Sequence, residues 1–144
     1  MFKLANPLVK RINYSGTLSL AMFLNGLGLL IQGLFPSFLG FAFGLFVQGN
    51  GYGIYIISVS KFMMAHIPDH MGFAAGVATC GTAFGAIYWG FFAMWIVNPG
   101  NLPATIPAIE NNRKTFYFDK EVAENLPQFF LIASAIAFVF AIIL

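Results

Sequence analysis

The sequence contains very little charge. Only 8% of its 144 residues are Asp, Glu, Lys or Arg, whereas 59% are apolar and 17% are aromatic. Ordinary soluble domains carry about 25% charged residues, because a surface that faces water needs them. The composition therefore argues against a water-soluble enzyme and predicts an integral membrane protein.

Catalytic and cofactor-binding motifs are absent as well. The sequence has no nucleophile elbow, phosphate-binding loop, Rossmann fingerprint or basic nucleic-acid patch. Its single cysteine, Cys80, cannot form an intrachain disulfide and is expected to be a small packing residue. The apolar runs carry charge only at their ends, which argues against an ion relay within them. We expect no enzyme activity, no catalytic residue, no cofactor and no nucleic-acid partner.

The few charged residues divide the chain into apolar segments. No Asp, Glu, Lys or Arg lies between Arg11 and Lys61, a stretch about twice the ~20 residues that one helix needs to cross a bilayer. Pro36 divides this stretch, because the residue before a proline avoids helical dihedrals. The predicted fold class is all-α, a polytopic membrane helical bundle in one domain over residues 1–144. Its four transmembrane helices are expected at about residues 14–35, 38–61, 72–97 and 128–144.

Residues 98–127 are expected to form a polar loop, because they hold four prolines, four acidic residues and three basic residues. Within this loop, residues 119–124 predict a short amphipathic helix along the membrane face. Its mixed charges are typical of a solvated face or a docking surface.

The distribution of charge predicts an orientation in the membrane. Four spans place both termini on the same side as the loop at residues 62–71. This side carries four bases, Lys3, Lys10, Arg11 and Lys61, against the single acid Asp69, whereas the other side carries three bases and four acids. By the positive-inside rule, the termini face the cytoplasm, or the matrix if the membrane is the mitochondrial inner membrane.

Glycine recurs at a spacing of four residues. This spacing places both members of a pair on one helix face, where the missing side chains let a neighbouring backbone approach closely. We interpret these glycines as helix-packing seams in preference to a ligand site. The pairs are Gly40/Gly44, Gly49/Gly53, Gly72/Gly76 and Gly81/Gly85.

A few polar residues near the second span are candidates for a site. Gln48 and Asn50 lie where its glycine-rich middle could bend and Lys61 lies at its end, so these three are candidates for a substrate path. Lys61 is equally explained by snorkelling to lipid head groups. His66 and His70 are weak candidate metal ligands, because Pro68 between them breaks the helix that would align them; we expect no metal.

The order of these motifs resembles the major facilitator superfamily. The segment Gly40 to Tyr55 followed by Lys61-Phe62 is similar to a glycine-rich fourth helix that ends in a basic residue. The segments Met71 to Gly76 and Gly81 to Ala86 are similar to the small-residue fifth helix that follows. The segment Asn98-Pro99-Gly100-Asn101 resembles the oxalate/formate antiporter and monocarboxylate transporter branch. Residues 10–16 depart from the family pattern, because they lack the acid of its conserved loop.

The resemblance implies a particular function. Transporters of this family have twelve helices in two six-helix halves, and this chain resembles only the last four helices of one half. We therefore expect a transporter-derived, non-transporting accessory subunit of a larger membrane complex, such as a mitochondrial respiratory complex. Its partners would be the lipid bilayer and other membrane subunits. The alternative is half of a transporter for small organic anions such as oxalate, formate or a monocarboxylate, which needs a complementary half.

Overall fold

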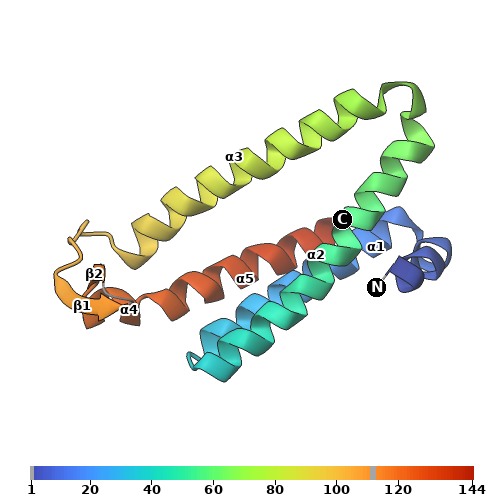
Figure 1. The fold of residues 1–144 in the computed structure, drawn as a ribbon. Helices are drawn as coiled ribbons and strands as arrows, with labels where there is room; N and C mark the ends of the chain where they lie inside the picture. The colour runs from blue at the N-terminus through green and yellow to red at the C-terminus, as the bar shows by residue number, and fades with distance from the viewer. Residues whose placement is uncertain (1, 111–112) are drawn as a thin grey trace.

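The computed structural model describes residues 2–110 and 113–144, with the side chains of residues 13–107 and 114–144. This part of the chain is mostly helical, so the predicted all-α class is confirmed (Figure 1). Three of its helical segments are long and apolar enough to cross a membrane, namely Asn13–Leu34, Pro68–Val97 and Lys120–Ile143. These segments are compatible with an integral membrane protein.

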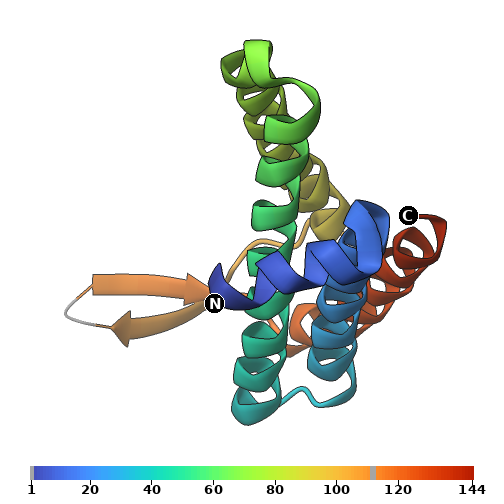
Figure 2. The same cartoon turned by 90° about the vertical axis from the view of Figure 1, so that its right-hand side faces the viewer.

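Helix α1 (Phe2–Leu34) consists of two helices that meet at Asn13. Asn13 has φ 71° and ψ 166°, which a helix cannot contain, and its Oδ1 accepts a hydrogen bond from the Tyr14 N–H at 2.7 Å. The segment before Asn13 turns away from the rest of the helix (Figure 2). The first predicted span, residues 14–35, therefore begins where the structure breaks the helix.

Helix α2 (Phe38–His66) begins at Ser37, whose side chain accepts a hydrogen bond from the Gly40 N–H at 3.1 Å. It continues five residues beyond the predicted span at 38–61. Although α2 is long, it is not one of the three segments that are apolar enough to cross a membrane, because Gln48, Asn50 and several glycines interrupt its middle. A fourth crossing therefore stays a prediction.

Helix α3 (Met71–Val97) follows a 3₁₀ turn, η1 (Pro68–His70). The predicted polar loop after it contains more regular structure than the sequence indicated. Strands β1 (Ile106–Glu110) and β2 (Arg113–Tyr117) pair antiparallel, with Ile106 opposite Tyr117. The short helix α4 (Lys120–Glu124), capped by Asp119, confirms the predicted helix at residues 119–124. Helix α5 (Leu126–Ile143) completes the chain.

The core of the structure is formed by α1, α2 and α5, with α1 packed against both of the others (Figure 1). Both seams depend on glycine. A methyl group built at Gly28 would lie 2.6 Å from the carbonyl oxygen of Gly44, so α1 and α2 meet backbone to backbone. On the other side of α1, the Ser134 hydroxyl donates to the carbonyl oxygen of Gly26 at 3.0 Å, and this bond is buried.

Different segments of the chain meet at the two ends of this core. The Ser15 hydroxyl donates to the carbonyl oxygen of Leu144, and the ring of Tyr14 contacts that of His66, so the C-terminus and the end of α2 lie beside the start of the long segment of α1. The turn after α1 lies near Pro127 at the opposite end. The side of a membrane that either end faces stays a prediction.

Gly44→Ala is expected to destabilise the core. The added methyl group would lie 2.5 Å from Cγ of Gln32 and 2.7 Å from the carbonyl oxygen of Gly28. Overpacking of this kind costs about 1–3 kcal/mol, so we expect a lower unfolding temperature in circular dichroism of the detergent-solubilised protein.

The matched control for this change is Gly49→Ala. No heavy atom of the described residues lies within 4 Å of a methyl group built at Gly49. An alanine in a helix interior is favoured over glycine by about 0.5–1 kcal/mol, so this variant should be as stable as the parent or slightly more stable. Equal unfolding temperatures for the two variants would contradict the α1–α2 seam.

Candidate functional site

The most unusual feature of the structure is the isolation of α3. This helix is apolar along its whole length, yet none of its residues is buried by the rest of the described chain. It contacts the core mainly near its C-terminal end, where the rings of Trp89 and Phe92 lie 6.2 and 6.4 Å from that of Phe129 on α5. There the Asn125 amide also donates to the carbonyl oxygen of Val97 at 3.3 Å. Elsewhere α3 stands apart from the core (Figure 1).

A groove separates α3 from the core. It consists of a cavity of about 540 Å³ between α2 and α3 and a second of about 550 Å³ between Trp89 and the core helices. The two cavities share Tyr52 and Tyr55, and we call them together the α3 groove. On its α3 side the lining is small, and these residues are Ala75, Ala78, Thr79, Thr82, Ala83 and Ala86. They recur every three or four residues and so form one face of the helix.

The polar groups of the α3 groove are uncharged. The hydroxyl groups of Thr79 and Thr82 donate to carbonyl oxygens of their own helix, at 2.9 and 3.1 Å. The hydroxyls of Tyr52 and Tyr55 and the indole N–H of Trp89 are on exposed side chains and make no hydrogen bond within the described residues. An unpaired polar group is costly inside a bilayer, because no water replaces the missing partner. The groove can therefore bind an apolar molecule or helix that also offers hydrogen-bond acceptors.

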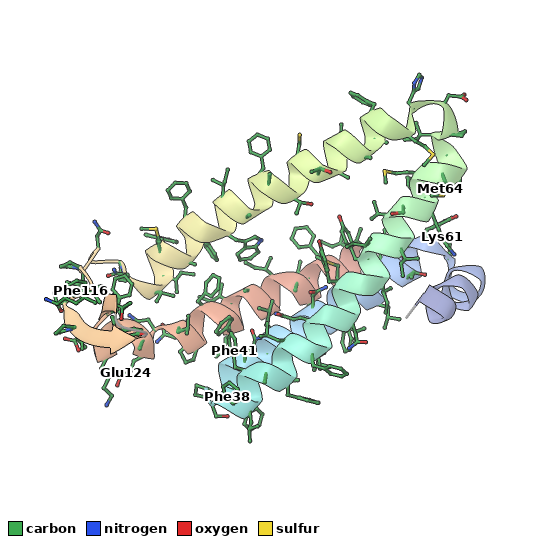
Figure 3. The ribbon with its side chains drawn as sticks, in the orientation of Figure 1. Phe38, Phe41, Lys61, Met64, Phe116 and Glu124 are labelled. Atoms are coloured by element: carbon green, nitrogen blue, oxygen red, sulfur yellow. The ribbon has the colours of Figure 1, made fainter. Side chains whose placement is uncertain are left out.

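The three residues predicted for a substrate path do not converge. The Gln48 side chain lies against Gly28 on α1, within the α1–α2 seam. The Asn50 amide donates to the carbonyl oxygen of Phe46 on its own helix at 2.7 Å. Lys61 lies about three turns further along α2, towards the end opposite Phe38 and Phe41 (Figure 3). None of the three lines the α3 groove.

The two histidines have different surroundings. His66 Nδ1 lies 3.0 Å from the carbonyl oxygen of Phe62, and its ring stacks on that of Phe62 with 4.3 Å between centroids. His70 is exposed at the end of the η1 turn. Among the described residues, no group of three His, Cys, Asp or Glu side chains is close enough to hold a metal ion.

The predicted packing glycines have different surroundings. Gly44 lies in the α1–α2 seam, and Gly40 lies against Phe35 in the turn that precedes α2. A methyl group built at any of the other six would meet no heavy atom of the described chain within 4 Å; these are Gly49, Gly53, Gly72, Gly76, Gly81 and Gly85. Packing of these six against another chain stays a prediction.

Sequence reasoning identified Gly44 but missed the other glycines at close contacts within the core. Gly26, Gly28, Gly33 and Gly51 all lie at close helix contacts. A spacing of seven residues separates Gly26 from Gly33 and Gly44 from Gly51, and so could have found three of these four; Gly28 has no glycine seven residues away. A spacing of seven is the heptad period of helices that pack side by side.

Phe129→Ala is expected to detach α3 from α5, because this ring contacts both Trp89 and Phe92. The test uses a Trp95→Phe background, so that Trp89 is the only tryptophan. In brominated detergent, loss of Phe129 should increase the quenching of Trp89 roughly in proportion to its new exposure. Phe116→Ala in the β hairpin is the control and should leave the quenching unchanged. Equal quenching in both variants would show that Phe129 does not hold α3.

Comparison with protein-family models, with curated proteins and with solved structures gave no match to this chain.

Proposed function

We propose that this chain is an integral membrane protein that serves as a non-transporting accessory subunit of a larger membrane complex. In this proposal, transmembrane helices of other subunits pack along α3 and fill the α3 groove. The termini would face the cytoplasm or, in a mitochondrial inner membrane, the matrix. The resemblance to major facilitator transporters would then reflect the origin of the helices and not a transport activity.

The observation that carries this proposal is the isolation of α3. Water is an unfavourable environment for this helix, because 27 residues of this composition would expose a large apolar surface. Lipid alone is a poor partner for its small-residue face, since small residues are typical of positions where a second helix approaches closely. The unpaired groups of Tyr52, Tyr55 and Trp89 add hydrogen-bond donors on the same groove.

The geometry gives less support to a half-transporter for small organic anions. Such a site needs a cationic group that faces a cavity, and no Lys or Arg lines the α3 groove as the structure describes it. The only basic residue suggested for this role, Lys61, lies outside the groove. The half-transporter remains the alternative against which the accessory subunit is tested.

The mass of the native assembly tests the proposal. Extraction from membranes with a mild detergent, followed by light scattering and identification of the co-purifying chains, should give a complex that contains other membrane polypeptides. Washing with a harsher detergent should release this chain from them. A monomer or a homodimer under mild extraction would contradict the proposal.

Transport measurements separate the two candidate functions. Vesicles that hold only this chain should take up no more oxalate, formate or lactate than vesicles without protein. The same result is expected after the co-purifying polypeptides are added back, because the accessory subunit supplies no anion site. Uptake that appears with a second polypeptide would favour the half-transporter instead.

A further inference from the structure

We propose that a pocket at one end of the core binds an uncharged lipid with a hydroxyl head group on an apolar body. This inference goes beyond the proposed function. It rests on the part of that proposal which places the chain in a membrane, and it does not depend on partner subunits.

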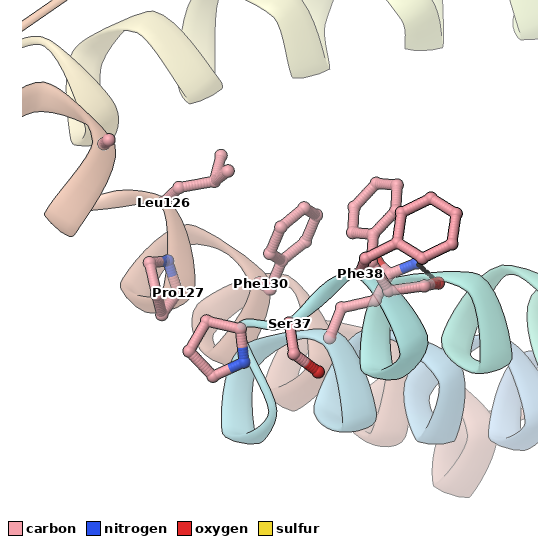
Figure 4. A pocket seen from close by; sticks show the side chains of 9 residues that line it. Ser37, Phe38, Leu126, Pro127 and Phe130 are labelled. Carbon is pink, nitrogen blue, oxygen red and sulfur yellow. Dashed lines mark hydrogen bonds between the residues drawn. The ribbon is translucent and has the colours of Figure 1, made fainter.

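The pocket lies where the turn between α1 and α2 meets the start of α5 (Figure 4). Its volume is about 340 Å³, at the small end of the range for ligand sites, so it holds the head of a lipid and the first part of its apolar body. The walls of this end pocket are mainly apolar and come from Phe38, Phe41, Leu126, Pro127 and Phe130. The rings of Phe41 and Phe130 meet edge to face, with 5.9 Å between their centroids.

Gln32 supplies the polar group that selects the ligand. This residue lines the end pocket although only 3% of its surface is exposed. Its one hydrogen bond within the described residues is long, 3.5 Å from Nε2 to the carbonyl oxygen of Phe41. Its Oε1 accepts no hydrogen bond there. The small exposed part of Gln32 therefore leaves an acceptor open to the pocket, where a ligand or a water molecule can donate to it.

Ser37 is the second polar residue on the lining of the end pocket. Its Oγ accepts from the Gly40 N–H at 3.1 Å, and its own O–H remains able to donate. A lipid hydroxyl can therefore donate to Gln32 Oε1, while Ser37 offers a separate donor on the lining of the same pocket. None of the side chains that line the end pocket is charged, so a phosphate or ammonium head group would lose its hydration without gaining an ion partner.

The position of the end pocket along the core suits a lipid head group. Helix α4, which precedes α5 directly, carries the exposed ion pair of Lys120 and Glu124, at 3.5 Å. The change from this charged helix to the apolar α5 marks the level where a bilayer changes from head groups to hydrocarbon. Phe38 is 85% exposed at the same end, as expected of an aromatic ring that contacts lipid.

Two photoactivatable probes test this inference, a diazirine-labelled sterol and a diazirine-labelled diacylglycerol, each at low concentration in phosphatidylcholine nanodiscs that hold the chain. After illumination, mass spectrometry should locate the label on peptides that contain Phe38, Phe41 or Phe130. Labelling by one probe alone identifies the source of the hydroxyl, and labelling by either supports the shared chemistry. A phosphatidylcholine that carries the diazirine should label these peptides much less; equal labelling would overturn the selectivity for a hydroxyl.

Variants separate specific binding from contact with bulk lipid. Gln32→Leu should lower the labelling of the end pocket about five- to tenfold, as expected for loss of one hydrogen bond. Ala123→Trp fills the pocket from an exposed position on α4 and should abolish the labelling without disturbing the core. Gln48→Leu is the matched control, because it removes an amide that lies in the α1–α2 seam outside the pocket.

Labelling that is equal in the parent, Gln32→Leu and Ala123→Trp proteins would overturn the inference. Circular dichroism of each variant shows whether it is folded, and Ala123→Trp keeps the test valid if Gln32→Leu does not fold. Failure of the proposed function has a different signature. A chain that alkaline carbonate extracts from its native membrane is not an integral membrane protein, whereas a chain that stays in the membrane but lacks partner subunits leaves the lipid site unaffected.

Discussion

The close approach of helix backbones across glycine is the interaction on which this structure depends. At Gly28 and Gly44 the backbones of α1 and α2 are too close for any side chain to lie between them. In a membrane the hydrophobic effect gives little net attraction between helices, so van der Waals contact of this kind and interhelical hydrogen bonds hold them together. The buried bond from Ser134 to Gly26 is the corresponding contact between α5 and α1. These seams make α1 the centre of the core.

The same constraint explains why α3 stands apart. Its glycines could form seams of this kind, yet a methyl group built at any of them meets no heavy atom of the described chain within 4 Å. The aromatic contacts of Phe129 with Trp89 and Phe92 tie α3 to α5 near one end only. The α3 groove is the result, with small residues on one side and the unpaired hydroxyls of Tyr52 and Tyr55 on the other. A chain with one well-packed core and one unpacked apolar helix is suited to assembly with others.

Some of this architecture could be predicted from the sequence. The absence of charge between Arg11 and Lys61, together with Pro36, located two helices and the turn between them. The pattern at residues 119–124 located α4. Local patterns of this kind are visible in the sequence because the forces that cause them act over a few residues.

Other features could not be predicted because they depend on which helices meet. A spacing of four drew attention to Gly72, Gly76, Gly81 and Gly85, but of the glycines at close contacts within the core it found only Gly44 and missed Gly26, Gly28, Gly33 and Gly51. The pairing of β1 with β2 was missed because Pro107 and the charged residues Glu110, Arg113 and Lys114 interrupt the apolar alternation that predicts a strand. Gln48 and Asn50 were candidates for a substrate path, and the sequence did not show that the Gln48 side chain lies against Gly28 whereas the Asn50 amide donates to Phe46 of its own helix. The end pocket depends on α1, α2, α4 and α5 together, and no single segment of sequence indicates it.

The central claim is that other subunits cover α3, and site-specific photo-crosslinking in the native membrane tests it most directly. A benzophenone amino acid in place of Thr82, which lines the α3 groove, should form crosslinks to a different membrane polypeptide. The same probe in place of Gln48, which faces α1, should react only within the chain. Crosslinks from position 82 to lipid alone, or only to α1, α2 and α5 of the same chain, would contradict the account.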